Sequence, residues 1–228
     1  MSYLIIQAGS TATRTAAGDY DQMFRLALGW ADRSVRTVRV FRGESLPLLA
    51  GLRGIVITGS PAMVTDRQDW SERTADWLRS AVAGPAPILG VCYGHQLLAH
   101  ALGGRVGDNP RGPDYGPVAV ALTEAGGADP LLSCLPPSDR ILYNAHSQSV
   151  LQAPSQGRPL AAGLHAMRFG AQVWGVQFYP EFTVPVMRGI LEMGRDRLTR
   201  EGLDVAARNE RIDATGRRLL KRFAEICG

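Results

Sequence analysis

The segment that most limits how this chain can fold is Gly90-Val91-Cys92-Tyr93-Gly94-His95-Gln96. An apolar run at residues 88–91 leads into the cysteine, and a helix-forming run at residues 97–102 follows the motif. A cysteine between a strand and a helix, with glycine two residues to either side, is typical of a nucleophile elbow, whose tight turn requires small flanking residues. The segment therefore predicts a strand, a sharp bend that presents the Cys92 thiol, and a helix.

The first half of the chain alternates apolar, β-branched runs with helix-length segments. Strands are expected at residues 3–6, 35–41, 54–58 and 88–91. Helices are expected at residues 19–30, which Asp19 would cap, and at residues 70–83. Strands and helices in such short alternation predict an α/β fold, in which an open, mostly parallel sheet is flanked by helices on both faces.

The second half has a different pattern. Shorter strands separated by turn residues are expected at residues 118–122, 141–144, 163–169 and 173–178. They suggest antiparallel additions to the sheet, and two helical segments, at residues 184–199 and 213–226, follow them. Because no linker, internal repeat or low-complexity tract interrupts the chain, a single domain over residues 1–228 is expected.

The composition indicates a globular protein. The 228 residues are 45% apolar and 20% charged, which is enough for one α/β domain with a buried core. No apolar stretch approaches the ~18–20 residues of a membrane helix. Residues 1–6 resemble a buried strand rather than a signal peptide, because a basic region and a cleavage site are missing. We therefore expect a cytoplasmic protein with no membrane partner.

Cysteine usage and charge exclude other classes of function. The three cysteines, Cys92, Cys134 and Cys227, are far apart, and no pair has a metal-ligand spacing such as Cys-x-x-Cys. We therefore expect a reducing compartment, no disulfide framework, no metal and no cofactor. The net charge of +4 is dispersed except at residues 217–222, where basic residues at helical spacing indicate a solvated helix face. Nucleic acid is therefore not an expected partner.

The position of Cys92 would favour nucleophilic chemistry. A helix N-terminus is electropositive, so we expect it to lower the pKa of the thiol. The Tyr93 main-chain N–H would point at the reacting atom and donate to an oxyanion. Gly59-Ser60-Pro61 follows the strand at residues 54–58 and would supply a second donor, because strand-end loops gather at the carboxyl edge of a parallel sheet. The alternative interpretation of Cys92 is a small buried hydrophobic residue.

Four segments together resemble the class I glutamine amidotransferases, notably the glutaminase domain of GMP synthetases. The elbow resembles the nucleophile motif of that family, and Thr58-Gly59-Ser60-Pro61 resembles its Ser-Gly-Gly-Pro oxyanion loop. Residues 144–150 (NAHSQSV) and 174–181 (WGVQFYPE) resemble its Ser-His-Gly-Asp-x-Val and Gly-x-Gln-Phe-His-Pro-Glu segments. The resemblance spans roughly residues 3–190 and implies a flavodoxin-like sheet of the class I amidotransferase architecture.

The resemblance also implies roles for individual residues. Cys92 would attack the γ-carbonyl of glutamine or of another γ-glutamyl compound, and Glu181 matches the acidic member of the catalytic triad. The oxyanion hole would be formed by the loop and elbow residues Gly59, Ser60 and Tyr93. The glutamyl group would be held by four residues of the elbow helix and of the segment at residues 144–150, namely Gln96, His146, Ser147 and Gln148.

The catalytic histidine of the family corresponds to Tyr179. A tyrosine with a pKa of about 10 is a poor general base at neutral pH, and losing one member of a nucleophile triad typically costs about 10⁴- to 10⁶-fold in turnover. A cysteine needs a base less than a serine does. Tyr179 could also protonate the departing amine, which requires least help when the amine is a weaker base than ammonia, as in a γ-glutamyl arylamide.

The remaining histidines offer a weaker alternative. His95 and His146 lie in segments where the family often carries histidine, His100 falls on the elbow helix, and His165 has no supporting context. His146 is the favoured candidate among them for a replacement base. For His100 a packed or surface position is the expected one.

Three functions are therefore open at this point. The first is a cysteine-dependent γ-glutamyl amide hydrolase that forms a γ-glutamyl thioester on Cys92 with a modified triad. Its ammonia or amine would be released or passed to a separate synthetase or amine-using subunit. The second is a catalytically silent binding or regulatory subunit, and the third is another thiol chemistry on the same scaffold. The sequence leaves a homo-oligomer open in each case.

Overall fold

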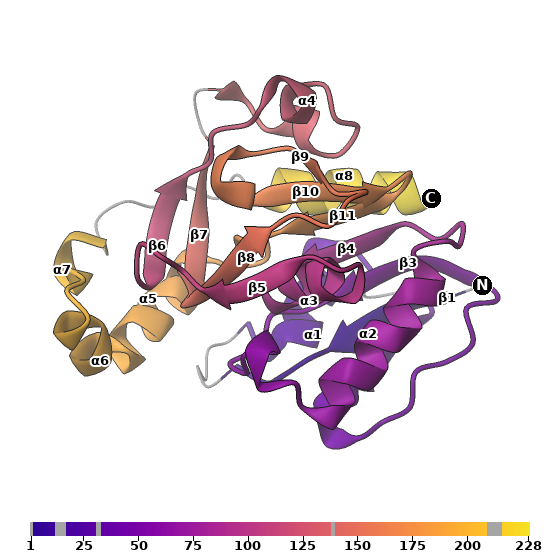
Figure 1. Ribbon diagram of the computed structural model, residues 1–228, viewed down its shortest axis with the longest axis horizontal. Helices are drawn as coiled ribbons and strands as arrows, with labels where there is room; N and C mark the ends of the chain where they lie inside the picture. The colour runs from indigo at the N-terminus through magenta and orange to yellow at the C-terminus, as the bar shows by residue number, and fades with distance from the viewer. Residues whose placement is uncertain (1, 12–16, 31–32, 138–139, 209–215) are drawn as a thin grey trace.

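A seven-stranded sheet forms the centre of the computed structural model, which describes residues 2–11, 17–30, 33–137, 140–208 and 216–228 (Figure 1). The strand order is β2-β1-β3-β4-β11-β10-β9, and the first five strands are parallel. The bounds are β1 Ser2–Gln7, β2 Val35–Arg39, β3 Leu52–Ile57, β4 Ile88–Val91, β11 Val173–Val176, β10 Ala166–Gly170 and β9 Arg158–Pro159. This arrangement confirms the predicted open, mostly parallel sheet.

The antiparallel additions in the second half are of two kinds. Strands β10 and β9 extend the main sheet in antiparallel pairing. Two separate antiparallel pairs lie beside it, β5 (Arg105–Asp108) with β8 (Gln148–Gln152), and β6 (Asp114–Ala119) with β7 (Ile141–His146). The additions were predicted, but no local pattern indicated that four of the strands would pair outside the main sheet.

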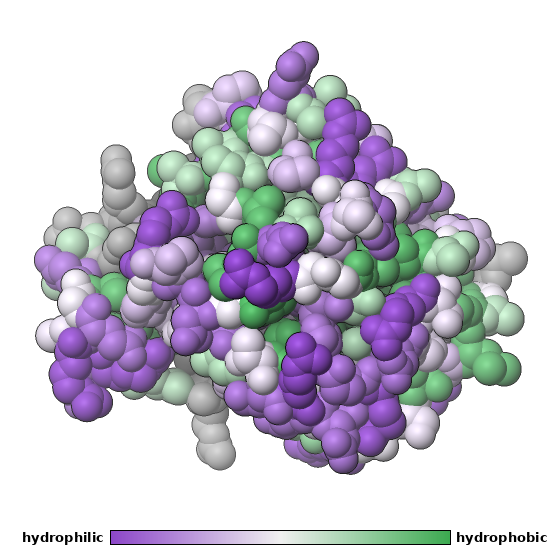
Figure 2. Space-filling model, in the orientation of Figure 1, coloured by the Kyte–Doolittle hydropathy of each residue, from purple (hydrophilic) through white to green (hydrophobic). Residues whose placement is uncertain are grey.

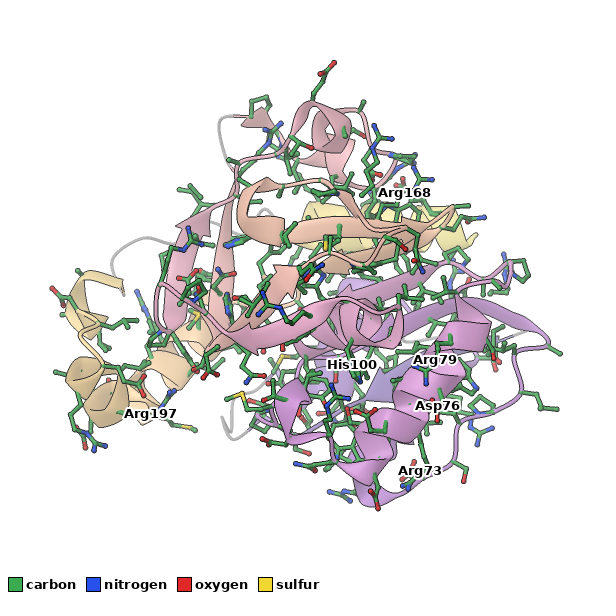
Figure 3. All side chains as sticks on the ribbon, in the orientation of Figure 1. Arg73, Asp76, Arg79, His100, Arg168 and Arg197 are labelled. Atoms are coloured by element: carbon green, nitrogen blue, oxygen red, sulfur yellow. The ribbon has the colours of Figure 1, made fainter. Side chains whose placement is uncertain are left out.

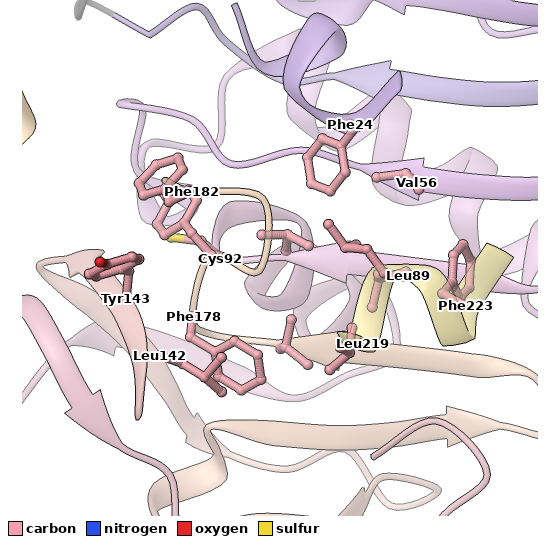
Figure 4. Packing of buried hydrophobic residues seen from close by; sticks show 14 of the residues in the cluster. Phe24, Val56, Leu89, Cys92, Leu142, Tyr143, Phe178, Phe182, Leu219 and Phe223 are labelled. Carbon is pink, nitrogen blue, oxygen red and sulfur yellow. The ribbon is translucent and has the colours of Figure 1, made fainter. Parts of the chain in front are cut away.

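Helices cover both faces of the sheet because successive strand residues point to opposite sides. On one face, Ile5, Val56 and Leu89 belong to the same apolar cluster as Phe24 of α1 (Tyr20–Ala27) and Phe223 of α8 (Gly216–Cys227) (Figure 4). On the other face, the alternate strand residues pack with α2 (Asp69–Ala81) and α3 (Tyr93–Ala101) in a second cluster. The chain therefore forms a three-layer structure with helices on the two outer sides.

Several elements begin or end at residues other than those predicted. Helix α1 begins after Asp19, which caps it as predicted, but it stops at Ala27 because Gly29 adopts a positive φ of 65° that ends the helix. The predicted strand at 163–169 begins only at Ala166, since Gly163 also has a positive φ and lies in a short 3₁₀ turn. Asp213, the expected start of the final helix, lies outside the described residues.

The helical segment predicted at residues 184–199 is divided at Gly194. Helix α5 spans Val184–Met193 and α6 spans Arg195–Arg200, followed by the short α7 (Val205–Arg208). A short helix that the sequence did not indicate, α4 (Glu124–Gly127), lies between β6 and β7 in the chain. Figure 1 shows α5, α6 and α7 beside the β6–β7 pair.

The surface is mixed in polarity. Figure 2 shows a face on which hydrophilic residues predominate and hydrophobic areas are small. Arg217, Arg218 and Lys221 of α8 are exposed, as expected for a solvated helix face. Within the described ranges, no helix combines the length and the apolar character needed to cross a bilayer.

The register of the parallel strands brings their carboxyl ends to one edge. Ile6 of β1 pairs with Ile57 of β3, which pairs with Gly90 of β4, and Val91 of β4 pairs with Val176 of β11. The residues that follow these strands therefore meet at the edge where ligands bind in open α/β sheets.

Candidate active site

Cys92 lies at a sharp bend between β4 and α3. Its backbone has a φ of 48° and a ψ of −98°, a conformation that few residues other than glycine adopt. Its N–H donates to the Val176 carbonyl at 2.8 Å, which fixes the bend to the neighbouring strand. A Cβ on Gly90 would lie 2.5 Å from the Gly94 carbonyl oxygen, and one on Gly94 would lie 2.5 Å from the Ile57 carbonyl oxygen. These contacts confirm the elbow and its need for glycine on both sides.

Among the residues that the structure describes, three hydrogen-bond donors surround the Cys92 sulfur. They are the Tyr93 main-chain N–H, the Gln177 side-chain amide at 3.5 Å, and the Tyr179 hydroxyl. Each of them favours the thiolate, yet burial, with a smaller contribution from the nearby Glu181 carboxyl, raises the pKa of the Cys92 thiol to about 12. The expectation of a lowered pKa is therefore wrong, because only 4% of Cys92 is exposed and the loss of hydration outweighs the donors.

The predicted oxyanion residues come together at the ends of β3 and β4. Tyr93 begins α3, and N–H groups of the first helical turn have no acceptor within the helix. The Ser60 hydroxyl donates to the Ala8 carbonyl at 2.9 Å and accepts from the Ala62 N–H at 3.1 Å, so it fixes the loop. Ser60, Tyr93 and Cys92 line one pocket. The arrangement leaves the Ser60 and Tyr93 N–H groups as the candidate oxyanion donors.

Gly59 packs directly against the Tyr179 side chain, where a larger residue would not fit. A Cβ on Gly59 would lie 2.5 Å from a ring carbon of Tyr179 and 2.8 Å from its hydroxyl oxygen. Glycine at this position therefore leaves room for the tyrosine ring against the strand end.

Tyr179 is held in a stack of aromatic rings. Its ring lies parallel to that of Phe182, with centroids 4.0 Å apart, and 6.4 Å from that of Tyr20. Its main-chain N–H donates to the Tyr143 carbonyl at 2.8 Å. Burial raises the pKa of Tyr179 well above its ordinary value, so the side chain is a neutral phenol that donates a hydrogen bond rather than a base. Figure 4 shows Phe182 close to Cys92 on the same side of the sheet.

Glu181 is buried without a hydrogen-bond partner for either carboxyl oxygen among the described residues. Burial raises the pKa of Glu181 to about 8. The Tyr179 hydroxyl donates to the Cys92 sulfur, and neither Glu181 oxygen accepts from it, so Cys92, Tyr179 and Glu181 lie near one another but do not form a continuous hydrogen-bonded chain.

Replacing Glu181 with glutamine is expected to stabilise the protein at alkaline pH. The folded-state pKa of about 8 lies above the unfolded value of about 4.3, so the folded state binds more protons between these values and the free energy of unfolding falls as pH rises. Glutamine is neutral throughout. Glu181→Gln should match the parent near pH 5 and exceed it at pH 8.5 by on the order of 3–4 kcal/mol in urea unfolding.

A matched control for that experiment is Glu225→Gln on α8, whose carboxyl is half exposed and forms a surface ion pair with Arg222. Its effect should stay within about 1 kcal/mol at both pH values. A Glu181→Gln variant whose advantage does not grow with pH would contradict the raised pKa.

The predicted glutamyl-binding residues also line the pocket, which has a volume of about 300 Å³. The Gln96 side-chain amide donates to the Gln148 carbonyl at 2.7 Å and to the Gln177 amide oxygen at 3.2 Å. The Gln148 side chain donates to the Thr65 hydroxyl at 2.7 Å, and the Ser147 carbonyl accepts from the Asn109 N–H at 2.8 Å. Main chain and side chains on this side of the pocket are thus tied together, and their role in binding a glutamyl group stays a prediction.

Two of the four histidines lie away from the sulfur. His95 is fully buried against Phe169, its Nε2 lies 3.0 Å from the Leu164 carbonyl, and burial lowers its pKa to about 3. His100 of α3 pairs with Glu72 of α2 at 3.0 Å and is partly buried, as expected for a packed or surface residue (Figure 3).

His146 and His165 do not serve the sulfur either. His146 lines the pocket, but its Nδ1 is 2.9 Å from the Gln148 carbonyl and its Nε2 lies 3.9 Å from Asp114. Burial lowers the pKa of His146 to about 4. His165 lies 3.5 Å from Arg111 in a different pocket. Within the described part of the chain, no histidine forms a hydrogen bond to Cys92, so a replacement base among the four stays a prediction without a supporting contact.

The sequence interpretation missed part of the pocket. Gln177 touches the sulfur, and its place directly after β11, within the WGVQFYPE segment, was the available signal. The larger apolar or aromatic lining residues were also missed, and they are Tyr20, Met63, Tyr115, Phe182, Ile190 and Met193. Tyr115 belongs to the stretch at residues 108–116, whose glycine and proline content favours a loop that borders the pocket but does not predict its individual contacts. Ile190 and Met193, three residues apart on α5, carried no sequence signal for a site.

Comparison with known proteins supports the same assignment. The family model described as glutamine amidotransferase class-I matches residues 28–191. A glutamine-hydrolyzing GMP synthase of Aeropyrum pernix is 36% identical over 143 residues, which cover 61% of this chain and 25% of that protein. This chain therefore spans about a quarter of the length of that relative. Gamma-glutamyl peptidase 5 of Arabidopsis thaliana is 26% identical over 190 residues, or 80% of this chain and 76% of that one.

A solved structure supports the fold. A glutamine amidotransferase from Thermotoga maritima superposes with a TM-score of 0.75 and 19% identity, covering 99% of this chain and 97% of that one. The elbow, the strand order and a family match over most of the chain agree, and this protein belongs to the class I glutamine amidotransferase family.

Proposed function

We propose that the protein hydrolyses a γ-glutamyl amide through a γ-glutamyl thioester on Cys92. The observation that carries this proposal is the placement of the Cys92 thiol on an elbow, in one pocket with the Ser60 and Tyr93 loops and with Gln96. The class I amidotransferase match and the likeness to a GMP synthase and to a γ-glutamyl peptidase support hydrolysis of this bond type.

The proposed reaction has two steps. The Cys92 thiol loses its proton to solvent, and its sulfur attacks the γ-carbon while the Ser60 and Tyr93 N–H groups donate to the carbonyl oxygen. The C–N bond breaks as the Tyr179 hydroxyl gives its proton to the departing amine. Water then attacks the thioester and returns a proton to Tyr179, so that glutamate leaves and the sulfur is freed for another cycle.

The amine has two proposed fates. It is released into the cytoplasm, or it passes to a separate synthetase or amine-using subunit. The length of the Aeropyrum pernix GMP synthase, of which this chain matches a quarter, supports the second fate. The three free thiols agree with a reducing compartment.

A thiol-alkylating analogue of glutamine tests the proposal. Incubation with a chloroketone analogue should modify Cys92 stoichiometrically, as located by peptide mass spectrometry, and glutamine should protect it. Because the thiolate is the reactive form and the pKa of Cys92 is raised to about 12, the labelling rate should rise about tenfold per pH unit from pH 7 to pH 9.

Cys134 is the internal control for the specificity of the labelling. Cys134, which is outside the pocket and donates to the Leu131 carbonyl, should remain unmodified by the analogue. A labelling rate that levels off below pH 8 would show a thiol with an ordinary or lowered pKa. Absence of labelling at every pH would contradict the proposal.

A second candidate function is a catalytically silent subunit that binds a γ-glutamyl ligand. The separation of Glu181 from Tyr179, together with the raised pKa of Cys92, favours it. Under this alternative, glutamine binds in the pocket without turnover, and calorimetry detects binding to a protein that the analogue does not label.

A further inference from the structure

One half of the active-site pocket is lined by residues that are not among the predicted glutamyl-binding residues. The polar half is formed by Gln96 and the turn between β7 and β8. The other half has side chains from α1, β6, the loop after β11 and α5, and these are Tyr20, Tyr115, Phe182, Ile190 and Met193. We call this set the aromatic half of the pocket. It is continuous with the ring stack in which Tyr179 lies.

The position of this half relative to Tyr179 indicates what it would contact. In the proposed reaction the Tyr179 hydroxyl protonates the departing nitrogen, so any substituent on that nitrogen extends beyond Tyr179. Phe182 is stacked on Tyr179 at 4.0 Å, and Tyr20 lies on the same stack. A substituent on the amine would therefore meet these two rings first.

At its exposed end the aromatic half carries an apolar side chain, Met193, that other described residues leave largely open to solvent. Met193 is 58% exposed, one of the few large hydrophobic residues with such exposure, and it lines the pocket together with Ile190 one helical turn earlier. Methionine adapts its shape to flat ligands, and sulfur contacts with aromatic rings are favourable. Exposed apolar side chains beside an apolar pocket indicate a ligand surface.

Among the described residues that line this pocket, the cationic side chain is Arg197, and it already interacts with other protein groups. Arg197 of α6 donates to the Tyr115 hydroxyl at 3.0 Å, lies over the Tyr115 ring, and pairs with Glu201 at 3.3 Å (Figure 3). Its charge is thus balanced before any ligand binds. The aromatic half therefore fits an uncharged group better than an acidic one.

We propose, on the basis of the hydrolysis proposed above, that the aromatic half is a subsite for an uncharged aromatic amine carried on the γ-carboxyl of glutamate. The substrate class is then a γ-glutamyl arylamide rather than free glutamine. A flat ring in this subsite contacts Phe182 and Met193, and its weakly basic nitrogen requires little protonation to leave, which suits a site whose proton donor is the phenol of Tyr179.

Binding to a Cys92→Ala variant tests this subsite without turnover. Calorimetry should give a Kd for γ-glutamylanilide at least tenfold lower than that for γ-glutamylmethylamide, because only the anilide places a ring in the subsite. Met193→Ala in the same background should raise the anilide Kd about three- to tenfold and leave the methylamide Kd unchanged. Met193→Leu should restore most of the loss.

The controls separate this inference from the proposed function. Leu26→Ala on α1 removes another exposed apolar side chain, one outside the pocket, and should change neither Kd. Equal affinity for the two amides would overturn the subsite and leave γ-glutamyl hydrolysis standing. Binding of neither compound would overturn both proposals.

Discussion

Replacing Tyr179 with histidine is expected to raise the rate of glutamine hydrolysis by about 10²- to 10⁴-fold, the usual contribution of a positioned general acid–base. An imidazole with a pKa near 6.5 accepts the Cys92 proton at neutral pH, which the buried phenol does not. The substitution also gives Glu181 a donor, since its carboxyl has no hydrogen-bond partner among the described residues. Ammonia release in a coupled assay measures the gain.

The pH profile of Tyr179→His provides a second readout. The parent protein should keep gaining activity as pH rises above 8, because the pKa of its Cys92 thiol is raised to about 12. The variant should reach its maximum near neutral pH, since an imidazolium next to the sulfur favours the thiolate.

Stability must be followed with activity in this experiment. Histidine loses part of the stack on Phe182 and Tyr20, at a cost of about 1–3 kcal/mol. Tyr179→Phe is the matched control, because it keeps the stack and removes only the hydroxyl, and it should gain no activity. A folded Tyr179→His protein with unchanged turnover would contradict the modified-triad interpretation and favour the silent subunit.

Replacing Cys92 with alanine is expected to lower turnover of any γ-glutamyl substrate by about 10⁴- to 10⁶-fold, as for removal of other nucleophiles. No thioester can form without the sulfur, and water alone would have to attack the amide. Single-turnover experiments with mass spectrometry should find the glutamyl adduct on the parent protein and none on Cys92→Ala.

Cys134→Ala is the control for general effects of losing a thiol. Cys134 is partly buried, donates to the Leu131 carbonyl and lies outside the pocket. Its replacement should leave turnover within about twofold of the parent. Residual activity of Cys92→Ala above about one per cent would exclude the thioester route, since it is far more than a nucleophile variant retains.

Much of the fold could be predicted from local pattern. The short apolar runs at residues 54–58 and 88–91 match β3 and β4 closely, because a buried parallel strand must be apolar on both faces. Asp19 was predicted as a cap because its side chain can accept the N–H groups of the first helical turn. By contrast, the pairing of β5 with β8 depends on residues that are about 40 positions apart in the sequence, and no local rule predicts it.

The candidate site was predictable to the extent that its residues follow the strands. Cys92, Ser60 and Gln96 were found from motifs, and the structure brings them to one pocket. The pKa of Cys92 was predicted wrongly because the helix N-terminus is a local feature, whereas burial by neighbouring strands and rings is not visible in the sequence. Met193 of α5 was missed for the same reason, since only the three-dimensional arrangement places it at the pocket.

The backbone at Cys92 has a consequence for engineering. A residue other than glycine at a φ of 48° costs the fold about 1–3 kcal/mol, and glycine would remove most of that cost. Selecting variants of this protein for heat resistance alone would therefore favour loss of the sulfur atom. A thermostability screen of this protein therefore needs a parallel thiol-labelling assay, because without one it selects variants that have lost the Cys92 thiol.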